Sequence, residues 1–107
     1  MANYFFIGIG GSGMSPIAQT LAAQGHGVCG SDRNHDRGLN QALFDRLRAA
    51  GIKLFPQDGS GVAGCDFVVA SSAIEDTVPD MARARALGVP TLHRSQALAS
   101  IFNEKRG

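Results

Sequence analysis

The chain has 107 residues, enough for one compact domain with its own hydrophobic core, and we expect a single domain. Hydrophobic residues make up 44% of the chain and charged residues 18%, proportions that exclude a disordered tail. The formal net charge of +1 gives no electrostatic basis for nonspecific binding to nucleic acid or to an anionic membrane, so we expect a small-molecule or protein partner.

The first half of the chain alternates between short apolar runs and helical periodicity. Residues 4–9 are apolar without polar alternation, which is typical of a strand covered on both faces. Apolar residues then recur at helical spacing over 14–25, and a short second strand is predicted at 27–30. The polar, glycine-ended segment 33–38 is interpreted as a loop before a second helix over 39–50.

The second half continues the alternation. We predict strands at 52–55 and 66–70, a helix that begins at Pro79 and stops at Gly88, and a brief strand at 89–92. Ser95 is a candidate cap for a last helix that would carry Leu98, Ile101 and Phe102.

Strands and helices that alternate in this way predict right-handed crossovers and an α/β, Rossmann-like fold of three layers around a parallel five-stranded sheet. We expect residues 1–102 to form this domain and residues 103–107 to begin a linker. The N-terminus lacks the features of a signal peptide, and no apolar run approaches the roughly 20 residues that span a bilayer, which predicts a cytoplasmic protein. Cys29 and Cys65 lack C-x-x-C spacing, so a metal or redox site has little support and both are expected to be small buried hydrophobic residues.

A glycine-rich loop follows the first predicted strand. Gly8, Gly10 and Gly13 satisfy G-x-G-x-x-G between a strand and a helix, and Asp32 stands nineteen residues after Gly13 at the end of the second strand. Glycines let the backbone approach a diphosphate, amide N–H groups and the helix dipole attract its charge, and the carboxylate can accept hydrogen bonds from ribose hydroxyls. Nothing in this argument requires nicotinamide. The alternatives are a tight turn that binds nothing and an Asp32 that only forms a turn. If Asp32 binds ligand, its replacement by alanine should weaken binding and leave folding intact.

Further polar residues are expected at the same edge of the sheet. Gly11, Ser12 and Ser15 belong to the loop or the first helical turn, and Ser71, Ser72, Ala73 and Ile74 follow the fourth strand. His93 and Arg94 follow the fifth strand; Arg94 either binds an anion or only enters a helix, and His93 is interpreted as structural. Glu75, Asp76 and Asp80 are expected to form a solvated acidic turn, and we predict no metal site.

Five segments in order carry a family resemblance: FIGIGGSGMSPIA from Phe6, GSD at 30–32, VVASSAI ending at Ile74, the helix begun by Pro79, and GVPTLHRSQALA at 88–99. Together they resemble the N-terminal domain of the Mur ligases over almost the whole chain. Within that family they are most similar to members that join L-alanine to UDP-N-acetylmuramate, and the members that recycle murein tripeptide are the second choice.

The resemblance implies a UDP-N-acetylmuramate site. It implies that the loop from Gly10 to Ser15, which includes Met14, faces the diphosphate, that Asp32 faces the uridine ribose, and that Ser71 to Ile74 with His93 and Arg94 surround the nucleotide and sugar. Family members continue into a central ATPase domain and a C-terminal domain that this sequence does not include. The resemblance therefore implies that ATP and magnesium bind in the full-length enzyme, with no cofactor and no catalytic residue here.

Two other readings share the glycine loop, the acidic strand end and the size of the chain. One is an NAD(H)-binding regulatory Rossmann module, which would bind NADH without a catalytic neighbour. The other is an inactive domain with degenerate loops.

Overall fold

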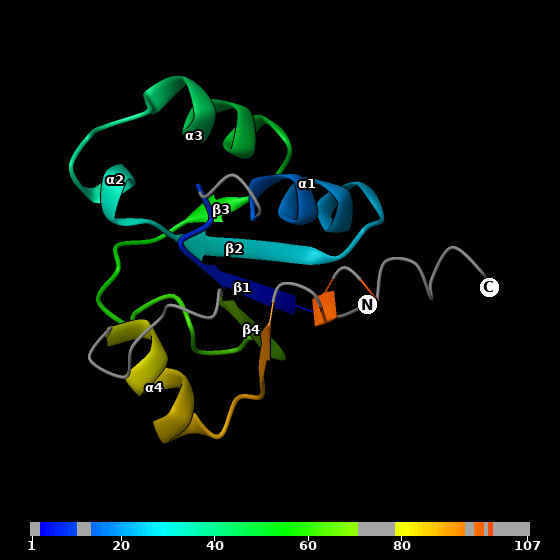
Figure 1. The fold of residues 1–107 in the computed structure, drawn as a ribbon, viewed down its shortest axis with the longest axis vertical. Coiled ribbons are helices and arrows are strands. Elements are labelled where there is room, and N and C mark those ends of the chain that lie inside the picture. Colours follow the sequence, from blue (N-terminus) through cyan, green and yellow to red (C-terminus); the bar gives the residue numbers. More distant parts are fainter. Residues whose placement is uncertain (1–2, 11–13, 71–78, 94–95, 98, 100–107) are drawn as a thin grey trace.

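A computed structural model describes residues 3–10, 14–70, 79–93, 96–97 and 99. Nine elements occur among these residues (Figure 1): β1 (Asn3–Ile7), α1 (Ser15–Ala23), β2 (Gly27–Ser31), α2 (Arg33–Asp36), α3 (Gln41–Ala49), β3 (Lys53–Leu54), β4 (Phe67–Ala70), α4 (Pro79–Leu87) and β5 (Thr91–His93). None of the helices in this described part of the chain is long and apolar enough to cross a membrane.

The five strands form one parallel sheet in the order β3-β2-β1-β4-β5, which confirms the predicted α/β fold. The chain starts at the central strand, β1, builds outward through β2 and β3, and then returns to the other side of β1 through β4 and β5. The strand order therefore reverses between β1 and β4. In open α/β sheets, ligands bind beyond the carboxyl ends of the strands at such a switch point.

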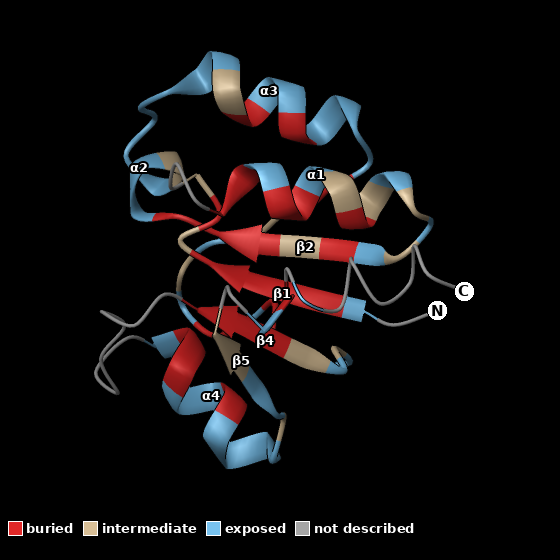
Figure 2. Ribbon diagram, turned by 45° about the vertical axis from the view of Figure 1, so that its right-hand side comes forward, coloured by how far each residue is buried: buried red, intermediate tan, exposed pale blue. Residues whose placement is uncertain are grey.

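Helices cover both faces of the sheet, and the side chains of β1 alternate between them (Figure 2). Tyr4 and Phe6 pack in the cluster that contains residues of α1 and α3, whereas Phe5 and Ile7 pack in the cluster that contains residues of α4. All four side chains are at most 5% exposed. Burial on both faces explains why this strand is continuously apolar instead of alternating.

Several element boundaries differ from the sequence prediction. β1 ends at Ile7 and not at residue 9, because Gly8 turns the chain with a φ of +78°. Residues 33–36, predicted as loop, form the short helix α2, because Asp32 caps it. α3 begins at Gln41, so Leu39 lies before the helix and is 50% exposed.

The predicted last helix lies mostly outside the described residues, as do Ser95 and Leu98. Gln96, Ala97 and Ala99 are helical, and Ala97 is buried in the cluster shared with α1 and α3.

The prediction that the two cysteines are buried was wrong, and the structure adds a contact between them that was not predicted. Cys29 and Cys65 are only half-buried, and their sulfur atoms lie 3.6 Å apart although the residues are 36 positions apart in the chain. The sheet brings them together: Cys29 pairs with Phe5 in β1, and the chain directly after Cys65 is hydrogen-bonded to the start of β1, where the Asp66 N–H donates to the Asn3 carbonyl.

Candidate ligand-binding site

The carboxyl ends of four strands align at one edge of the sheet. Ile7 pairs with Ser31, Phe6 with Val69, and Ala70 with His93. Four segments therefore begin at the same edge of the sheet: the glycine loop, the segment that begins with Asp32, and the segments that follow β4 and β5. This arrangement agrees with the edge at which the sequence predicted a ligand site.

The beginning of the glycine loop is tied to the end of β2 by three consecutive amide groups. The N–H groups of Gly8 and Ile9 donate to the Ser31 carbonyl at 2.8 and 3.0 Å, and the Gly10 N–H donates to Asp32 Oδ2 at 2.9 Å. These amides are occupied by the chain itself and are not the anion donors that the glycine pattern suggests. Amide donors for a diphosphate must come from later residues, up to the first turn of α1.

Gly10 is required by packing as well as by any ligand. A Cβ at this position would lie 2.9 Å from Asp32 Oδ2 and 3.0 Å from Phe44 Cζ of α3. Gly30 is similarly constrained, since a Cβ there would lie 2.7 Å from the Phe6 carbonyl oxygen and 2.8 Å from Ile9 Cδ1. Both glycines let the loop after β1 lie directly against β2.

The first helix begins at this loop without a side-chain cap. Met14 occupies the N-cap position and makes no capping hydrogen bond, and Pro16 lies in the first turn. Met14 is 3% exposed and Ser15 is 9% exposed, so both sequence-predicted site residues are buried at the start of α1. The positive end of the dipole of α1 therefore faces this loop, and an anion placed there would be stabilised by it.

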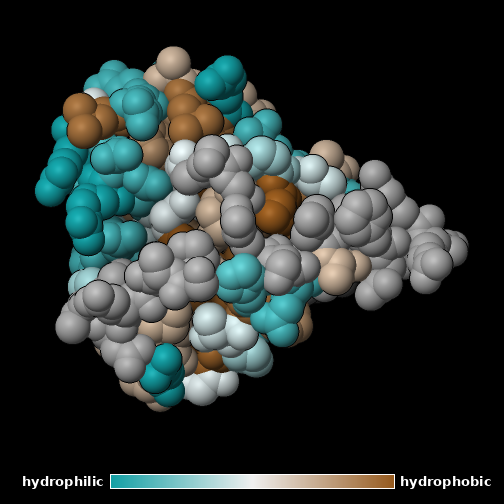
Figure 3. All heavy atoms as spheres, viewed as in Figure 1, coloured by the Kyte–Doolittle hydropathy of each residue, from teal (hydrophilic) through white to brown (hydrophobic). Residues whose placement is uncertain are grey.

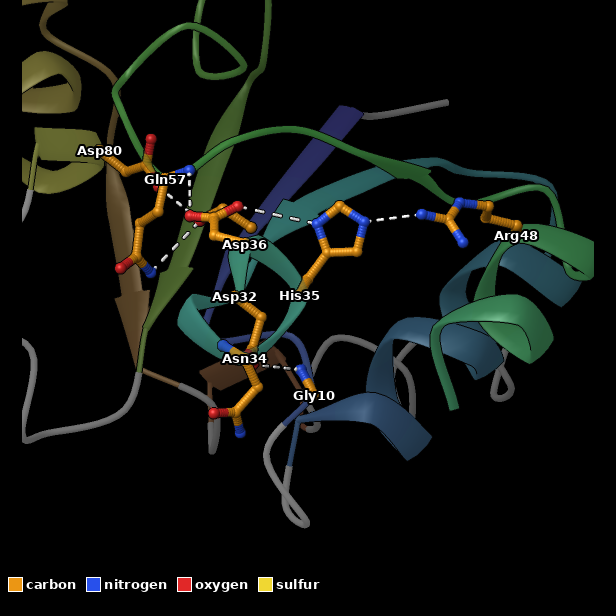
Figure 4. Close-up of polar contacts among 9 residues, drawn as sticks. Gly10, Asp32, Asn34, His35, Asp36, Arg48, Gln57 and Asp80 are labelled. Atoms are coloured by element: carbon orange, nitrogen blue, oxygen red, sulfur yellow. Dashed lines mark hydrogen bonds and ion pairs between the residues drawn. The ribbon is translucent and has the colours of Figure 1, made fainter. Parts of the chain in front are cut away.

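Asp32 is 7% exposed and uses both carboxylate oxygens within the protein. Oδ2 accepts from the Gly10 N–H at 2.9 Å, and Oδ1 accepts from the Asn34 N–H at 2.8 Å as the N-cap of α2 (Figure 4). A carboxylate offers about four acceptor positions, so capacity remains for two ligand hydroxyls. Asp32 therefore connects the glycine loop to the end of β2 through hydrogen bonds, and it is also a candidate contact for a ribose.

Asp80 contradicts the prediction of a solvated acidic turn, because its side chain is fully buried. Its carboxyl group accepts from the Ser31 hydroxyl at the end of β2 and from the Gly59 N–H at 2.8 Å. Burial is the main cause that raises the pKa of Asp80. Asp80 joins the start of α4 to the end of β2 across the switch point. Nothing in the sequence indicated this role, because an aspartate after a proline is common at the start of an exposed helix.

A polar network extends from this point to α3 (Figure 4). The Gln57 side-chain amide lies 3.5 Å from Ser31 Oγ, and the Gln57 N–H donates to Asp36 Oδ2 at 3.0 Å. Beyond Asp36, His35 Nε2 lies 2.6 Å from an Arg48 guanidinium nitrogen, which docks α2 against α3. Hydrophilic side chains predominate on the surface around α2 and α3 (Figure 3). Within the described ranges, no three His, Cys, Asp or Glu side chains are grouped to hold a metal ion.

The remaining predicted site residues are only partly placed. His93 is half-buried at the end of β5, and its N–H donates to Gln96 Oε1 at 2.7 Å. Gly11, Ser12, Gly13, Ser71, Ser72, Ala73, Ile74 and Arg94 lie outside the described residues.

The fold and the site together define a Rossmann-like α/β domain with a glycine loop and an acidic residue at the neighbouring strand end. The family model described as "Mur ligase family, catalytic domain" matches residues 3–106. The chain belongs to the Mur ligase family.

One curated relative and two solved structures resemble this chain. A UDP-N-acetylmuramate–L-alanine ligase of Bifidobacterium longum subsp. infantis is 46% identical over 94% of this chain and 19% of its own length. The crystal structure of a UDP-N-acetylmuramate–alanine ligase from Thermotoga maritima superimposes with a TM-score of 0.83 at 28% identity, over 97% of this chain and 23% of that one. A murein peptide ligase from Psychrobacter arcticus shares the fold, with a TM-score of 0.81 at 22% identity over 94% of this chain and 20% of that one. The chain thus spans about a fifth of the relatives it matches.

Proposed function

We propose that this chain is the substrate-binding N-terminal domain of an ATP-dependent UDP-N-acetylmuramate:L-alanine ligase and holds the UDP-sugar. The 46% identity to an L-alanine ligase over nearly the whole chain carries the proposal. The preference over the recycling murein peptide ligases rests on the same identity, since the murein peptide ligase from Psychrobacter arcticus, at 22%, supports only the fold. We place this activity in the cytoplasm.

The diphosphate is assigned to the loop that leads into α1, with Gly10, Gly11, Ser12, Gly13, Met14 and Ser15 around it. Since the Gly10 N–H is bonded to Asp32, Gly10 contributes the absence of a side chain, and the amides that follow it contribute the donors. Asp32 receives the uridine ribose on its remaining acceptor positions. Ser71, Ser72, Ala73, Ile74, His93 and Arg94 are assigned to the nucleotide and sugar because they follow β4 and β5 at the same edge.

The contribution of this domain to catalysis is positioning. In the complete ligase, ATP phosphorylates the carboxylate of the sugar's lactyl group, and the amine of L-alanine attacks the acyl phosphate. We assign ATP, magnesium and the reacting groups to the central and C-terminal domains, beyond this chain, and expect no catalysis from the chain alone. A UDP end held in one orientation limits where the carboxylate can lie, and orientation of this kind can lower a barrier by roughly 7–11 kcal/mol.

Calorimetric titration tests the proposal. The 107-residue chain is titrated with UDP-N-acetylmuramate, with UDP and with NADH under the same conditions. Heat from both uridine ligands and none from NADH supports the assignment. Binding of NADH without a response to either uridine ligand would instead identify a dinucleotide module and overturn it.

A further inference from the structure

The two cysteine thiols meet at a hollow on the sheet, away from the carboxyl edge. Cys29 lies in the middle of β2, Cys65 lies two residues before β4, and their sulfur atoms are 3.6 Å apart. Both line a cavity of about 240 Å³ together with Asn3, Lys53 and Phe55. The thiols are therefore close to each other and reachable by a small molecule.

Cys29 lies in a strand that is paired on both sides, whereas Cys65 lies in a turn. Cys29 is paired on both sides, with Phe5 of β1 and Lys53 of β3. Cys65 follows Gly64, whose φ is +84°, and its N–H closes a turn on the Val62 carbonyl. A disulfide requires the sulfurs to approach by about 1.6 Å more, to the usual bond length of about 2.05 Å. The turn at Cys65 is the part that can supply this movement.

We propose that Cys29 and Cys65 are a redox-sensitive pair that a peroxide converts into an intramolecular disulfide. The proposal does not depend on the proposed function. It departs from the sequence analysis, which found little support for a redox site, because the parallel sheet creates a contact that the separation of the two residues along the chain hides.

Disulfide formation takes two steps, oxidation of one cysteine and attack by the other, and the surroundings of the two sulfur atoms indicate which cysteine is oxidised first. The Cys29 thiol lies 3.5 Å from the Tyr4 carbonyl, the Cys65 thiol lies 3.6 Å from the Gly61 carbonyl, and the two sulfur atoms are 3.6 Å apart. Burial raises the pKa of both thiols. At Cys29 the neighbouring Cys65 raises the pKa further and the Lys53 charge opposes the rise, whereas at Cys65 the Cys29 hydrogen bond opposes the rise and the Asp66 charge adds to it. We assign the first step to Cys65, because Cys29 is fixed between two strands and Cys65 lies in a turn.

Both steps balance with hydrogen peroxide as the oxidant. The Cys65 thiol gives up its proton and its sulfur attacks one peroxide oxygen; the O–O bond breaks, and the released hydroxide takes up that proton as water, which leaves a sulfenic acid on Cys65. The Cys29 sulfur then attacks the Cys65 sulfur, the S–OH bond breaks, and the Cys29 proton leaves with the hydroxide as a second water. Two thiols lose two electrons, and one peroxide is reduced to two waters.

The test uses the 107-residue chain, reduced and then exposed to hydrogen peroxide. After alkylation, trypsin digestion and non-reducing mass spectrometry, we expect peptide 1–33 linked to peptide 54–83, which contain Cys29 and Cys65 respectively. The intact mass should fall by two hydrogen atoms, titratable thiols should fall from two to none, and dithiothreitol should restore both. Thiols that stay free under excess peroxide, or cross-links only between chains, would overturn the proposal.

Single variants then test the order of the steps. In Cys29→Ser, we expect Cys65 to stop at a sulfenic acid that dimedone traps. In Cys65→Ser, we expect Cys29 to keep its thiol under the same treatment. Trapping on Cys29 but not on Cys65 would contradict the order. The wild-type measurement decides whether the disulfide forms even if either variant fails to fold.

Discussion

Replacement of Asp32 by alanine should destabilise the fold, in contrast to the expectation from the sequence that it would affect ligand binding alone. The change removes the N-cap of α2, which costs about 1 kcal/mol. It also removes the charged acceptor of the Gly10 N–H, and a hydrogen bond to a charged group contributes about 1.5–3 kcal/mol. The free energy of unfolding should therefore fall by about 2–4 kcal/mol.

Urea denaturation followed by circular dichroism measures this loss without any ligand. With a slope of about 1–2 kcal/mol/M for a chain of this size, the midpoint should fall by roughly 1–4 M. Asp32→Asn should lose only the second part, about 1.5–3 kcal/mol, because asparagine caps as well as aspartate but turns an amide donor toward the Gly10 N–H. Asp45→Ala is the matched control; its side chain is 72% exposed and pairs with Arg48 at the surface, so the change should stay within about 0.5 kcal/mol.

A midpoint for Asp32→Ala equal to that of the wild type would refute this reasoning. In that case the two backbone contacts would contribute nothing, and any loss of uridine ligand binding would report a direct contact with the ligand. If both stability and binding fall, binding must be compared at a temperature at which each variant is folded.

Three further changes test other parts of the structure. Gly10→Ala should lower the free energy of unfolding by about 1–3 kcal/mol in urea denaturation, because its Cβ would lie 2.9 Å from Asp32 Oδ2; an unchanged midpoint would contradict the packing. The folded state raises the pKa of Asp80 above the ordinary 3.8, so it binds the proton more tightly than the unfolded chain. Wild-type stability should therefore fall relative to Asp80→Asn as the pH rises from about 3.8 through the raised pKa; a constant difference between the two denaturation midpoints would contradict the shift. Oxidation that joins Cys29 to Cys65 closes a loop of 36 residues, and the oxidised chain should be about 4 kcal/mol more stable to urea than the reduced one; equal stability would indicate a strained bond.

The sequence predicted the fold because the signals for it are local. The apolar run around Phe5 and Phe6, the helical spacing after Met14 and the glycines at helix ends each depend on neighbouring residues only. Alternation of strand and helix then restricts the topology to a parallel sheet. The position of Asp32 at a strand end, beside the glycine loop, followed from the same alternation.

The contacts that were missed join residues far apart in the chain. Asp80 accepts from Ser31, 49 positions away, and Cys29 meets Cys65 at 36 positions. Both contacts depend on how the second half of the chain returns to the other side of β1, which local patterns do not encode. An aspartate after a proline at a helix start is ordinarily exposed, so nothing nearby distinguished Asp80 from a surface residue.

The glycines of the loop have a packing role in addition to the ligand-binding role for which the motif is usually recognised. Gly10 and Gly30 are small because the loop after β1 lies against β2, and the amides of Gly8, Ile9 and Gly10 are used to hold it there. That anchoring fixes where α1 begins, and the uncapped first turn of α1 is the part left to attract an anion. In the pattern G-x-G-x-x-G, the first two glycines therefore position the loop on β2, and our proposal leaves ligand binding to the amides beyond Gly10. Substitutions at Gly8, Ile9 or Gly10 should therefore lower the stability of the fold, whereas substitutions after Gly10 should weaken ligand binding.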